Sequence, residues 1–550
     1  MLKKPLKIRM LEILPGALTW LTLLGAPILS YFHPAWVAIY IILFDLYWFL
    51  KGANVAIHLV HSYRELKIHS QVDWNDLLRR LGDKDRLAQY LQSQSRLAGK
   101  NKLNQLYAKL AAQLEKLPLD RNYDWARIYH LVILATYKES FEVLDDSIAS
   151  VLNADYDPKK VIFVLASEER GGAEAASTVN VLEEKYRDKF HTFILSRHPD
   201  GLPGEAKVKS ANLTYGAKLA QQFLDRQGVA YERVIVSGFD SDTIISKNYL
   251  AHLTYDFLTA AKPLQTSYQP TPMFHNNIWD TPAVARVIAV TSSFWQLIEA
   301  SRPDRLITFS SHAMSFKTLV DVGFWRVDII PDDSHIFWQC FLRFNGDYRT
   351  KPLYTTVSMD AVMGATLWET LAAQYKQKRR WAWGVTEIAM TFPELLPNRK
   401  IPLWKRLLYA ERLLEGHYFW ATASIMLAVL GWLPLILGGD RFGSTVLALN
   451  LPVMTKAIMS IATFFLAFSV YINWVLLPPR PKHYNGWKSF SMLWQWIFSP
   501  FVASIFGSLP AIDAQTRLML GKYMETFWVT PKIRRSNLPP NPVSSEALTK

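Results

Sequence analysis

The chain has one cysteine in 550 residues, Cys340, which excludes an internal disulfide framework and agrees with a reducing compartment. It shows no internal repeat, and low-complexity composition is confined to the Pro/Ser-rich tail after Arg535. The N-terminus also lacks a short apolar run that ends in a small-residue cleavage site. We therefore expect the first apolar segment to be retained as an anchor.

Charged residues are scarce for a soluble protein. They make up 20% of the chain, whereas hydrophobic residues make up 50% and include 20 Trp. This composition is too charged for a pure bundle of membrane helices, so we expect a protein with both membrane and soluble parts. The net charge of +14 indicates anionic lipid headgroups and anionic substrates as partners and does not favour nucleic acid.

Long apolar stretches lie at the two ends of the chain. They are residues 16–32, 35–50, 416–439, 457–477 and 490–510. The first two predict a tight helical hairpin around His33-Pro34, and the next two are each long enough to span about 30 Å of hydrocarbon. The fifth is broken by Pro500 and is either spanning or re-entrant.

Basic residues flank several of these stretches, at Lys3, Lys4, Lys7, Arg9, Lys51, Arg480, Lys482 and Lys488. Because positive charge concentrates on the cytoplasmic side, we expect these loops and the middle of the chain to be cytoplasmic.

The middle of the chain has the mixed polar and apolar pattern of a globular domain. Residues 63–122 predict a helical arm that either packs beside the catalytic region or regulates it. From residue 128, strand-like runs (128–137, 160–167, 191–196 and 233–242) alternate with helix-like ones (140–153, 173–188 and 211–226). This alternation predicts an α/β fold with a mainly parallel, helix-covered sheet whose ligands bind after the strand ends.

Acidic and basic residues follow these apolar runs. Asp240 and Asp242 come directly after a predicted strand, where two carboxylates could share Mg²⁺ or Mn²⁺, although most such pairs are solvated turns. Lys207 precedes a helix containing Asn212, a favourable place for a phosphate. Asp332 and Asp333 are either the start of a helix or the position of a catalytic base.

Two basic and aromatic stretches follow. The first, "QKRRWAWG" at residues 377–384, suits a basic patch for an acidic partner, a membrane-interface anchor or part of an active site. The second, residues 400–415, suits a helix lying in the membrane interface or an ordinary amphipathic core helix.

Taken together, six motifs resemble those of the membrane-embedded, processive family-2 glycosyltransferases, the group of bacterial cellulose synthase catalytic subunits, hyaluronan synthases and chitin synthases. "LATYKES" resembles the family's Thr-Tyr-Asn-Glu, "KVKSAN" its Lys-x-x-x-x-Asn, and "DSD" its Asp-x-Asp. "PDDS" stands where Thr-Glu-Asp is usual, "QKRRW" fits Gln-x-x-Arg-Trp, and "FWVTPK" matches a Phe-x-Val-Thr-x-Lys gating loop. The likeness covers residues 128–395, the membrane segments and the gating loop.

This resemblance implies an architecture in which a cytoplasmic GT-A domain, Rossmann-like and binding nucleotide-sugar, is inserted between N-terminal and C-terminal transmembrane helices. The implied parts are a hairpin (1–62), an arm (63–125), a GT-A domain (126–395), an interfacial helix (396–416), transmembrane or re-entrant helices (417–525), and a gating loop with a tail (526–550).

The resemblance also implies roles for individual residues. Asp333 would be the catalytic base, and Asp242 with Asp240 would hold the metal. The residues that would bind the donor and its diphosphate are Thr136, Glu139, Glu168, Lys207, Asp240 and Arg380. Acceptor binding falls to Gln377, Arg380 and Trp381, and gating to Phe527, Val529, Thr530 and Lys532. Lys378 and Arg379 would face lipid headgroups.

Two positions depart from the family pattern. Glu168 and Glu169 stand where an Asp usually holds the nucleobase, and Asp332 stands where Glu is usual. The implied function is inverting, metal-dependent transfer from a nucleotide-sugar, a UDP-sugar by preference, to a growing polysaccharide at the inner face of the plasma membrane, coupled to export. A single-transfer glycolipid-forming enzyme and a non-catalytic membrane scaffold are the alternatives. The sequence leaves the oligomeric state open.

Overall fold

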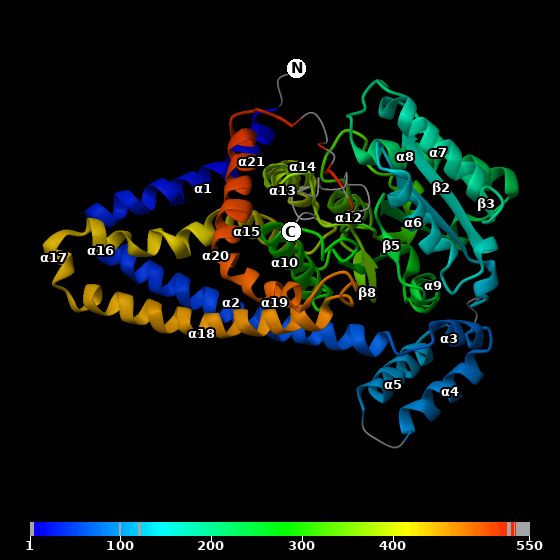
Figure 1. Cartoon of the computed structure of the whole chain (residues 1–550), viewed down its shortest axis with the longest axis horizontal. Coiled ribbons are helices and arrows are strands. Elements are labelled where there is room, and N and C mark those ends of the chain that lie inside the picture. The colour runs from blue at the N-terminus through cyan, green and yellow to red at the C-terminus, as the bar shows by residue number, and fades with distance from the viewer. Residues whose placement is uncertain are drawn as a thin grey trace, which may run out of the picture.

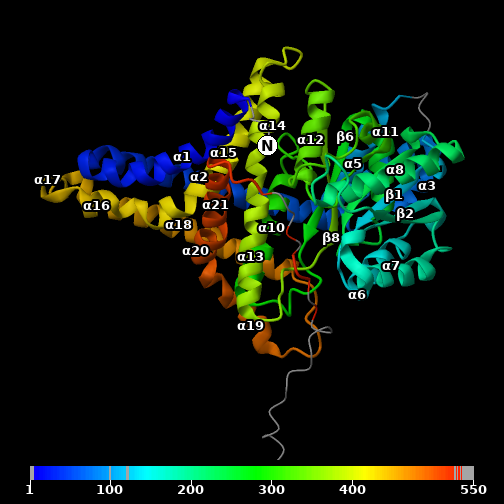
Figure 2. The same cartoon turned by 90° about the horizontal axis from the view of Figure 1, so that it is seen from above.

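The computed structural model describes residues 5–97, 101–118, 123–524, 528, 530–532 and 534. Figure 1 shows long helices on one side of the molecule and a sheet domain on the other. Viewed from above, α13 (Leu367–Ala382) and α14 (Thr386–Leu395) lie between these two parts (Figure 2).

The long helices carry the predicted apolar stretches. The expected hairpin is present as α1 (Leu6–Phe32) and α2 (Pro34–His69). In the described part of the chain, these two helices and the helical run Gly486–Met519 are long and apolar enough to cross a membrane. A fourth crossing is added if α15 (Leu403–Ala428) and the segment Leu430–Leu437, which are bent by 51°, form one span.

The remaining apolar stretches lie in helices of different lengths. Residues 457–476 belong to the 31-residue helix α18 (Val446–Leu476). The run Gly486–Met519 is built from α19 (Gly486–Trp494), α20 (Ser499–Val502), α21 (Leu509–Met519) and short 3₁₀ and π turns between them. Two short helices, α16 (Leu433–Leu437) and α17 (Gly439–Gly443), precede α18.

The segment expected as a separate interfacial helix, residues 396–416, is not separate. Its helical part belongs to α15, which continues through residue 416 into the third apolar stretch. Only Gly416 marks the expected boundary, and a glycine inside a helix costs only about 1 kcal/mol relative to alanine.

The sheet has eight strands in the order β3-β2-β1-β4-β7-β6-β8-β5. The four predicted strands are confirmed as β1 (Tyr129–Ala135), β2 (Val161–Glu168), β3 (Thr192–His198) and β4 (Val234–Asp240), and all pair in parallel. The other strands are β5 (Ile244–Ile245), β6 (Thr266–Met273), β7 (Ala313–Ser315) and β8 (Arg349–Ser358). β6 and β8 also pair in parallel. The short strands β7 and β5 pair antiparallel, β7 with β4 and β6 and β5 with β8, so the sheet is mixed but mainly parallel, as expected.

Both faces of the parallel part are covered. Val132 and Leu134 of β1 pack into one apolar cluster with α6 (Phe141–Leu152) and α7 (Gly172–Tyr186). Leu131 and Ile133 pack into a second cluster with α8 (Lys209–Gln227). Alternate residues of a strand face opposite sides, which is why one strand supplies both clusters.

The remaining helices complete the frame of the sheet domain. They are α9 (Tyr249–Thr259), α10 (Ala283–Ala300), α11 (Phe316–Asp321) and α12 (Asp332–Arg343). The arm consists of α3 (Trp74–Arg80), α4 (Lys84–Arg96) and α5 (Lys102–Glu115) and lies below the sheet domain in Figure 1. The arm packs on α9, where the Trp74 ring stacks on the His252 ring with 3.6 Å between the ring centres.

Candidate active site

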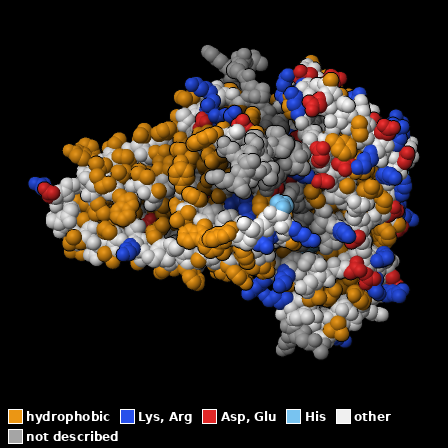
Figure 3. Space-filling model, in the orientation of Figure 1, with side chains coloured by type: hydrophobic (Ala, Val, Ile, Leu, Met, Phe, Trp, Pro, Cys, Tyr) orange, Lys and Arg blue, Asp and Glu red, His pale blue; other side chains and the backbone are white. Residues whose placement is uncertain are grey.

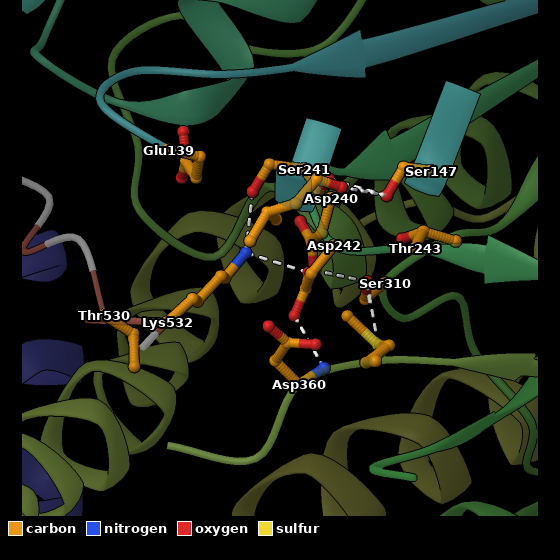
Figure 4. Close-up of polar contacts among 12 residues, drawn as sticks. Glu139, Ser147, Asp240, Ser241, Asp242, Thr243, Ser310, Asp360, Thr530 and Lys532 are labelled. Carbon is orange, nitrogen blue, oxygen red and sulfur yellow. Dashed lines mark hydrogen bonds and ion pairs between the residues drawn. The ribbon is translucent and has the colours of Figure 1, made fainter. Parts of the chain in front are cut away.

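The carboxyl end of β4 carries two acidic side chains that point to different partners. Asp242 is buried, with 2% of its side chain exposed, and its Oδ1 accepts a hydrogen bond from Lys532 Nζ at 2.8 Å (Figure 4). Its Oδ2 accepts from the backbone N–H of Asp360 at 2.8 Å. Burial raises the pKa of Asp242, and the charge of Lys532 opposes that rise.

Asp240, two residues earlier and the last residue of β4, is held by Lys209. Their Oδ1 and Nζ atoms lie 2.6 Å apart, and the hydroxyl of Ser310 donates to Asp240 at 2.6 Å. Burial disfavours the carboxylate, but the charges of Lys209 and Lys532 outweigh it and lower the pKa of Asp240. Asp240 is therefore ionised at neutral pH.

Lys209 also reaches the start of α12. Its ammonium lies 3.1 Å from Asp333 Oδ1, so one lysine connects the end of β4 to the proposed base. Asp333 retains 28% exposure of its side chain, whereas its neighbour Asp332 is buried. Burial, followed by the charge of Asp333, raises the pKa of Asp332 to about 7.

Lys207, predicted from the family spacing, does not join this cluster. Its ammonium lies 2.9 Å from Asp200, and 49% of its side chain is exposed. Lys209, which the sequence reasoning missed, is instead the first residue of α8 and has 10% exposure. The only hint of Lys209 in the sequence is that it is the second lysine of "KVKSAN". Asn212 donates to the carbonyls of Thr136 and Ala166 and ties α8 to the ends of β1 and β2.

Thr136 and Glu139 form the turn after β1. The Thr136 hydroxyl donates to Glu139 Oε2 at 2.7 Å, and the Tyr137 backbone N–H donates to the same oxygen at 2.8 Å. Figure 4 places Glu139 beside the Asp242 cluster but without a direct contact to it.

Glu168, at the end of β2, forms an ion pair with Arg170. The Arg170 guanidinium in turn lies 4.5 Å from the ring centre of Tyr137. Glu169 is exposed, so of the two glutamates Glu168 is the one placed at the strand end.

The "QKRRW" stretch lies on α13. Gln377 is buried and donates to Thr530 Oγ1 at 3.5 Å. Burial lowers the pKa of Arg380, and Asp240, Asp332 and Asp333 oppose that fall, so Arg380 lies within the field of the acidic cluster.

The neighbouring cations do not face lipid headgroups, contrary to expectation. Arg379 pairs with Asp513 of α21 at 2.9 Å, and Lys378 donates to Ser292 of α10 at 2.9 Å. The Lys378 ammonium also lies 4.5 Å from the ring centre of Trp381. Both cations are turned inward because α13 packs between α10 and α21.

The predicted gating loop is only partly within the described residues; Phe527 and Val529 lie outside them. Thr530 is buried, and Lys532 Nζ donates hydrogen bonds to Ser241 Oγ and Asp242 Oδ1. Arg534 contacts Asp360 at 3.0 Å, and neither residue was predicted. Asp360 follows β8 as Asp242 follows β4, and that placement after a strand was the available signal.

A divalent cation is compatible with this cluster. Among the described residues, no group of three His, Cys, Asp or Glu side chains is placed to hold a metal ion. Asp242 nevertheless already binds a cation, the Lys532 ammonium, and paired carboxylates are the ligands that Mg²⁺ and Mn²⁺ prefer. Diphosphate oxygens of a donor would complete the coordination shell.

The comparison with protein families covers the region that contains Asp240, Asp242, Asp333 and "QKRRW". Residues 235–477 match the family described as Glycosyl transferase family group 2. The chain carries a glycosyltransferase family 2 domain. The mixed sheet with its covering helices is accordingly a GT-A-like domain, preceded and followed by candidate apolar helices.

Among curated proteins, the chain is similar to poly-beta-1,6-N-acetyl-D-glucosamine synthases. Those of Staphylococcus aureus (strain COL) and Staphylococcus epidermidis are each 25% identical to it, over 280 and 278 residues. Both alignments cover 50% of this chain and 58% of the relative, so the chain spans little more than half the length of these relatives.

Two solved structures also align with the chain. The mannosyltransferase PcManGT from Pyrobaculum calidifontis, in complex with GDP-Man and Mn²⁺, is 15% identical with a TM-score of 0.37, covering 73% of this chain and 99% of its own. S. aureus TarS 1–349 in complex with UDP-GlcNAc is 12% identical with a TM-score of 0.33, covering 65% and 95%.

Proposed function

We propose that this protein is a membrane-embedded, inverting glycosyltransferase. It transfers a sugar from a UDP-sugar to a growing polysaccharide at the cytoplasmic face of the plasma membrane. The family 2 domain and the similarity to poly-beta-1,6-N-acetyl-D-glucosamine synthases support glycosyl transfer. Hydrophobic side chains cover the helical side of the molecule, whereas charged ones gather on the sheet domain, and this supports embedding in a membrane (Figure 3).

One observation carries the proposal: Lys209 binds Asp240 and Asp333 at the same time. It places an accessible carboxylate at a helix start beside a charged cluster at the end of β4. A glycosyltransferase needs this combination, because a base must face the acceptor hydroxyl while positive charge stabilises the leaving diphosphate.

In the proposed reaction, Asp333 accepts the proton of an acceptor hydroxyl while that oxygen attacks the anomeric carbon. The bond from this carbon to the diphosphate oxygen breaks on the opposite side, so the configuration inverts and the nucleoside diphosphate leaves. Lys209 and Arg380 hold positive charge near the leaving group. A divalent cation bound at Asp242 and Asp240 would supply further charge neutralisation.

The remaining residues are proposed to organise the two substrates. Thr136 and Glu139 follow β1, and Glu168 ends β2; these three residues would contact the donor, while Gln377 and Trp381 would contact the acceptor. Thr530 and Lys532 would close over the bound nucleotide and exclude water that could hydrolyse the donor.

The experiment that tests this function is the size distribution of labelled product. Membranes containing the protein are given radiolabelled sugar nucleotides with Mg²⁺ and Mn²⁺, beside Asp333→Asn membranes. We expect polymer much larger than one sugar, and none with the variant. A lipid-extractable product with one or two sugars would establish the glycolipid alternative, and donor binding without turnover would establish the scaffold alternative.

Replacing Trp381 tests the acceptor site. The Trp381 ring packs near Phe274, 6.4 Å between ring centres, and an indole stacks on a sugar ring through its apolar face. Trp381→Ala should lower polymer formation by about 10-fold or more while donor hydrolysis persists, because acceptor stacking is removed and the proposed donor-binding groups stay in place. Transfer and hydrolysis are assayed in parallel, and an equal fall in both would rule out the acceptor role.

A further inference from the structure

Glu387, on the first turn of α14, is a buried carboxyl group outside the cluster described above. It is 2% exposed, and no lysine or arginine among the described residues forms an ion pair with it. Its two oxygens are bound instead by α12. Oε1 accepts from the Ser334 hydroxyl at 2.6 Å, and Oε2 accepts from Trp338 Nε1 at 3.2 Å.

These two donors lie four residues apart and therefore on the same side of α12, one turn from each other. A carboxyl group that binds both spans that turn and fixes how the helix is rotated about its axis. Asp333 immediately precedes Ser334, so the same rotation sets the direction of the Asp333 carboxylate. In the structure this carboxylate faces Lys209 at 3.1 Å.

Burying the Glu387 carboxyl group costs free energy, and filling space in the core does not require a carboxyl group. Burial raises the pKa of Glu387 to about 7, and its two hydrogen bonds oppose the rise. An apolar side chain of similar volume would fill the space without that cost, but it could not hold α12 in one rotation. The directional bonds are what the carboxyl group adds.

We propose that Glu387 is a positioning residue that holds the start of α12, through Ser334 and Trp338, so that Asp333 faces the acceptor hydroxyl. It touches neither substrate. The inference rests on the proposed function, because it assumes that Asp333 is the base. Reacting groups displaced by about 1 Å lose on the order of 100-fold in rate, which sets the expected size of the effect.

The test compares Glu387→Leu with Glu387→Gln in the full-length protein in membranes. Leucine removes both hydrogen bonds, whereas glutamine can accept from Trp338 and donate to Ser334. We expect Glu387→Leu to lower kcat by about 30- to 100-fold with the donor KM changed by less than about 3-fold, and Glu387→Gln to stay within about 3-fold of wild type. Glu394→Gln, on the exposed side of the same helix, is the matched control and should leave both constants unchanged.

Ser334→Ala and Trp338→Phe each remove one of the two bonds and keep the proposal testable if Glu387→Leu fails to fold. We expect each to lower kcat, and Ser334→Ala to cost nothing further when added to Glu387→Leu. Wild-type kcat in folded Glu387→Leu, or in both single variants, would overturn the inference. An active Asp333→Asn enzyme would instead overturn the proposed function, so the two failures are distinguishable.

Discussion

Asp333→Asn should reduce sugar transfer by at least about 10³-fold, because the variant has no carboxylate to accept the acceptor's proton. Donor binding should persist, because the groups proposed to hold the donor lie at the ends of β1, β2 and β4 and on α13 and do not include Asp333. Transfer is measured as incorporation of radiolabelled sugar into product, and binding as retention of labelled nucleotide. Transfer at the wild-type rate would remove Asp333 from the mechanism.

Asp332→Asn provides the internal comparison for this experiment. Asp332 is buried, its pKa is raised to about 7, and its Oδ2 has no hydrogen-bond partner among the described residues, so its charge contributes less at neutral pH. The amide should therefore be tolerated better there than at Asp333, with transfer reduced by about 10-fold or less. A larger loss at Asp332 than at Asp333 would exchange the roles of the two residues.

Lys209→Met is the second substitution with a large expected effect. Burial disfavours the ammonium, but Asp240, Asp333 and Asp332 outweigh it and raise the pKa of Lys209, so the lysine is charged throughout the physiological range. Removing it leaves Asp240 and Asp333 without their shared cation. Transfer should fall by at least about 100-fold, because a preorganised positive charge near the leaving diphosphate is removed.

Lys207→Met is the matched control for that substitution. It removes the same kind of side chain two residues earlier, where the lysine is half-exposed and, among the described residues, forms an ion pair with Asp200 alone. Exposed ion pairs contribute between 0 and about 1 kcal/mol, so we expect transfer within about 3-fold of wild type. Initial transfer rates and donor binding are measured for both variants. A greater loss with Lys207→Met would return the diphosphate role to the residue that the family spacing indicates.

The local sequence pattern was sufficient to locate most residues of the candidate site. Apolar runs such as 160–167 and 233–242 predict strands because their residues must be buried on both faces of a covered sheet. The strand order along the chain then brings Thr136, Glu168 and Asp240 to one edge, since parallel strands share a carboxyl end. Their roles as donor ligands stay predictions.

The mixed half of the sheet could not be anticipated in the same way. β7 has three residues and β5 has two, which is too short for a period of two to be recognised. Their pairing is set by contacts with strands distant in sequence, as where Met314 of β7 lies opposite Val236 of β4. A contact of that kind leaves no signal in either segment alone.

The sequence by itself therefore determined the apolar anchors, the covered parallel sheet and the acidic residues after its strands, because burial and hydropathy act locally. Only the tertiary structure decided which basic residues reach those acids. Lys207 and Lys209 have the same chemistry, and their spacing does not distinguish them. Because α8 begins at Lys209, that lysine faces Asp240 and Asp333, while Lys207 stays on the preceding loop beside Asp200. Lys532 and Glu387 likewise reach their partners only through packing between segments far apart in the chain.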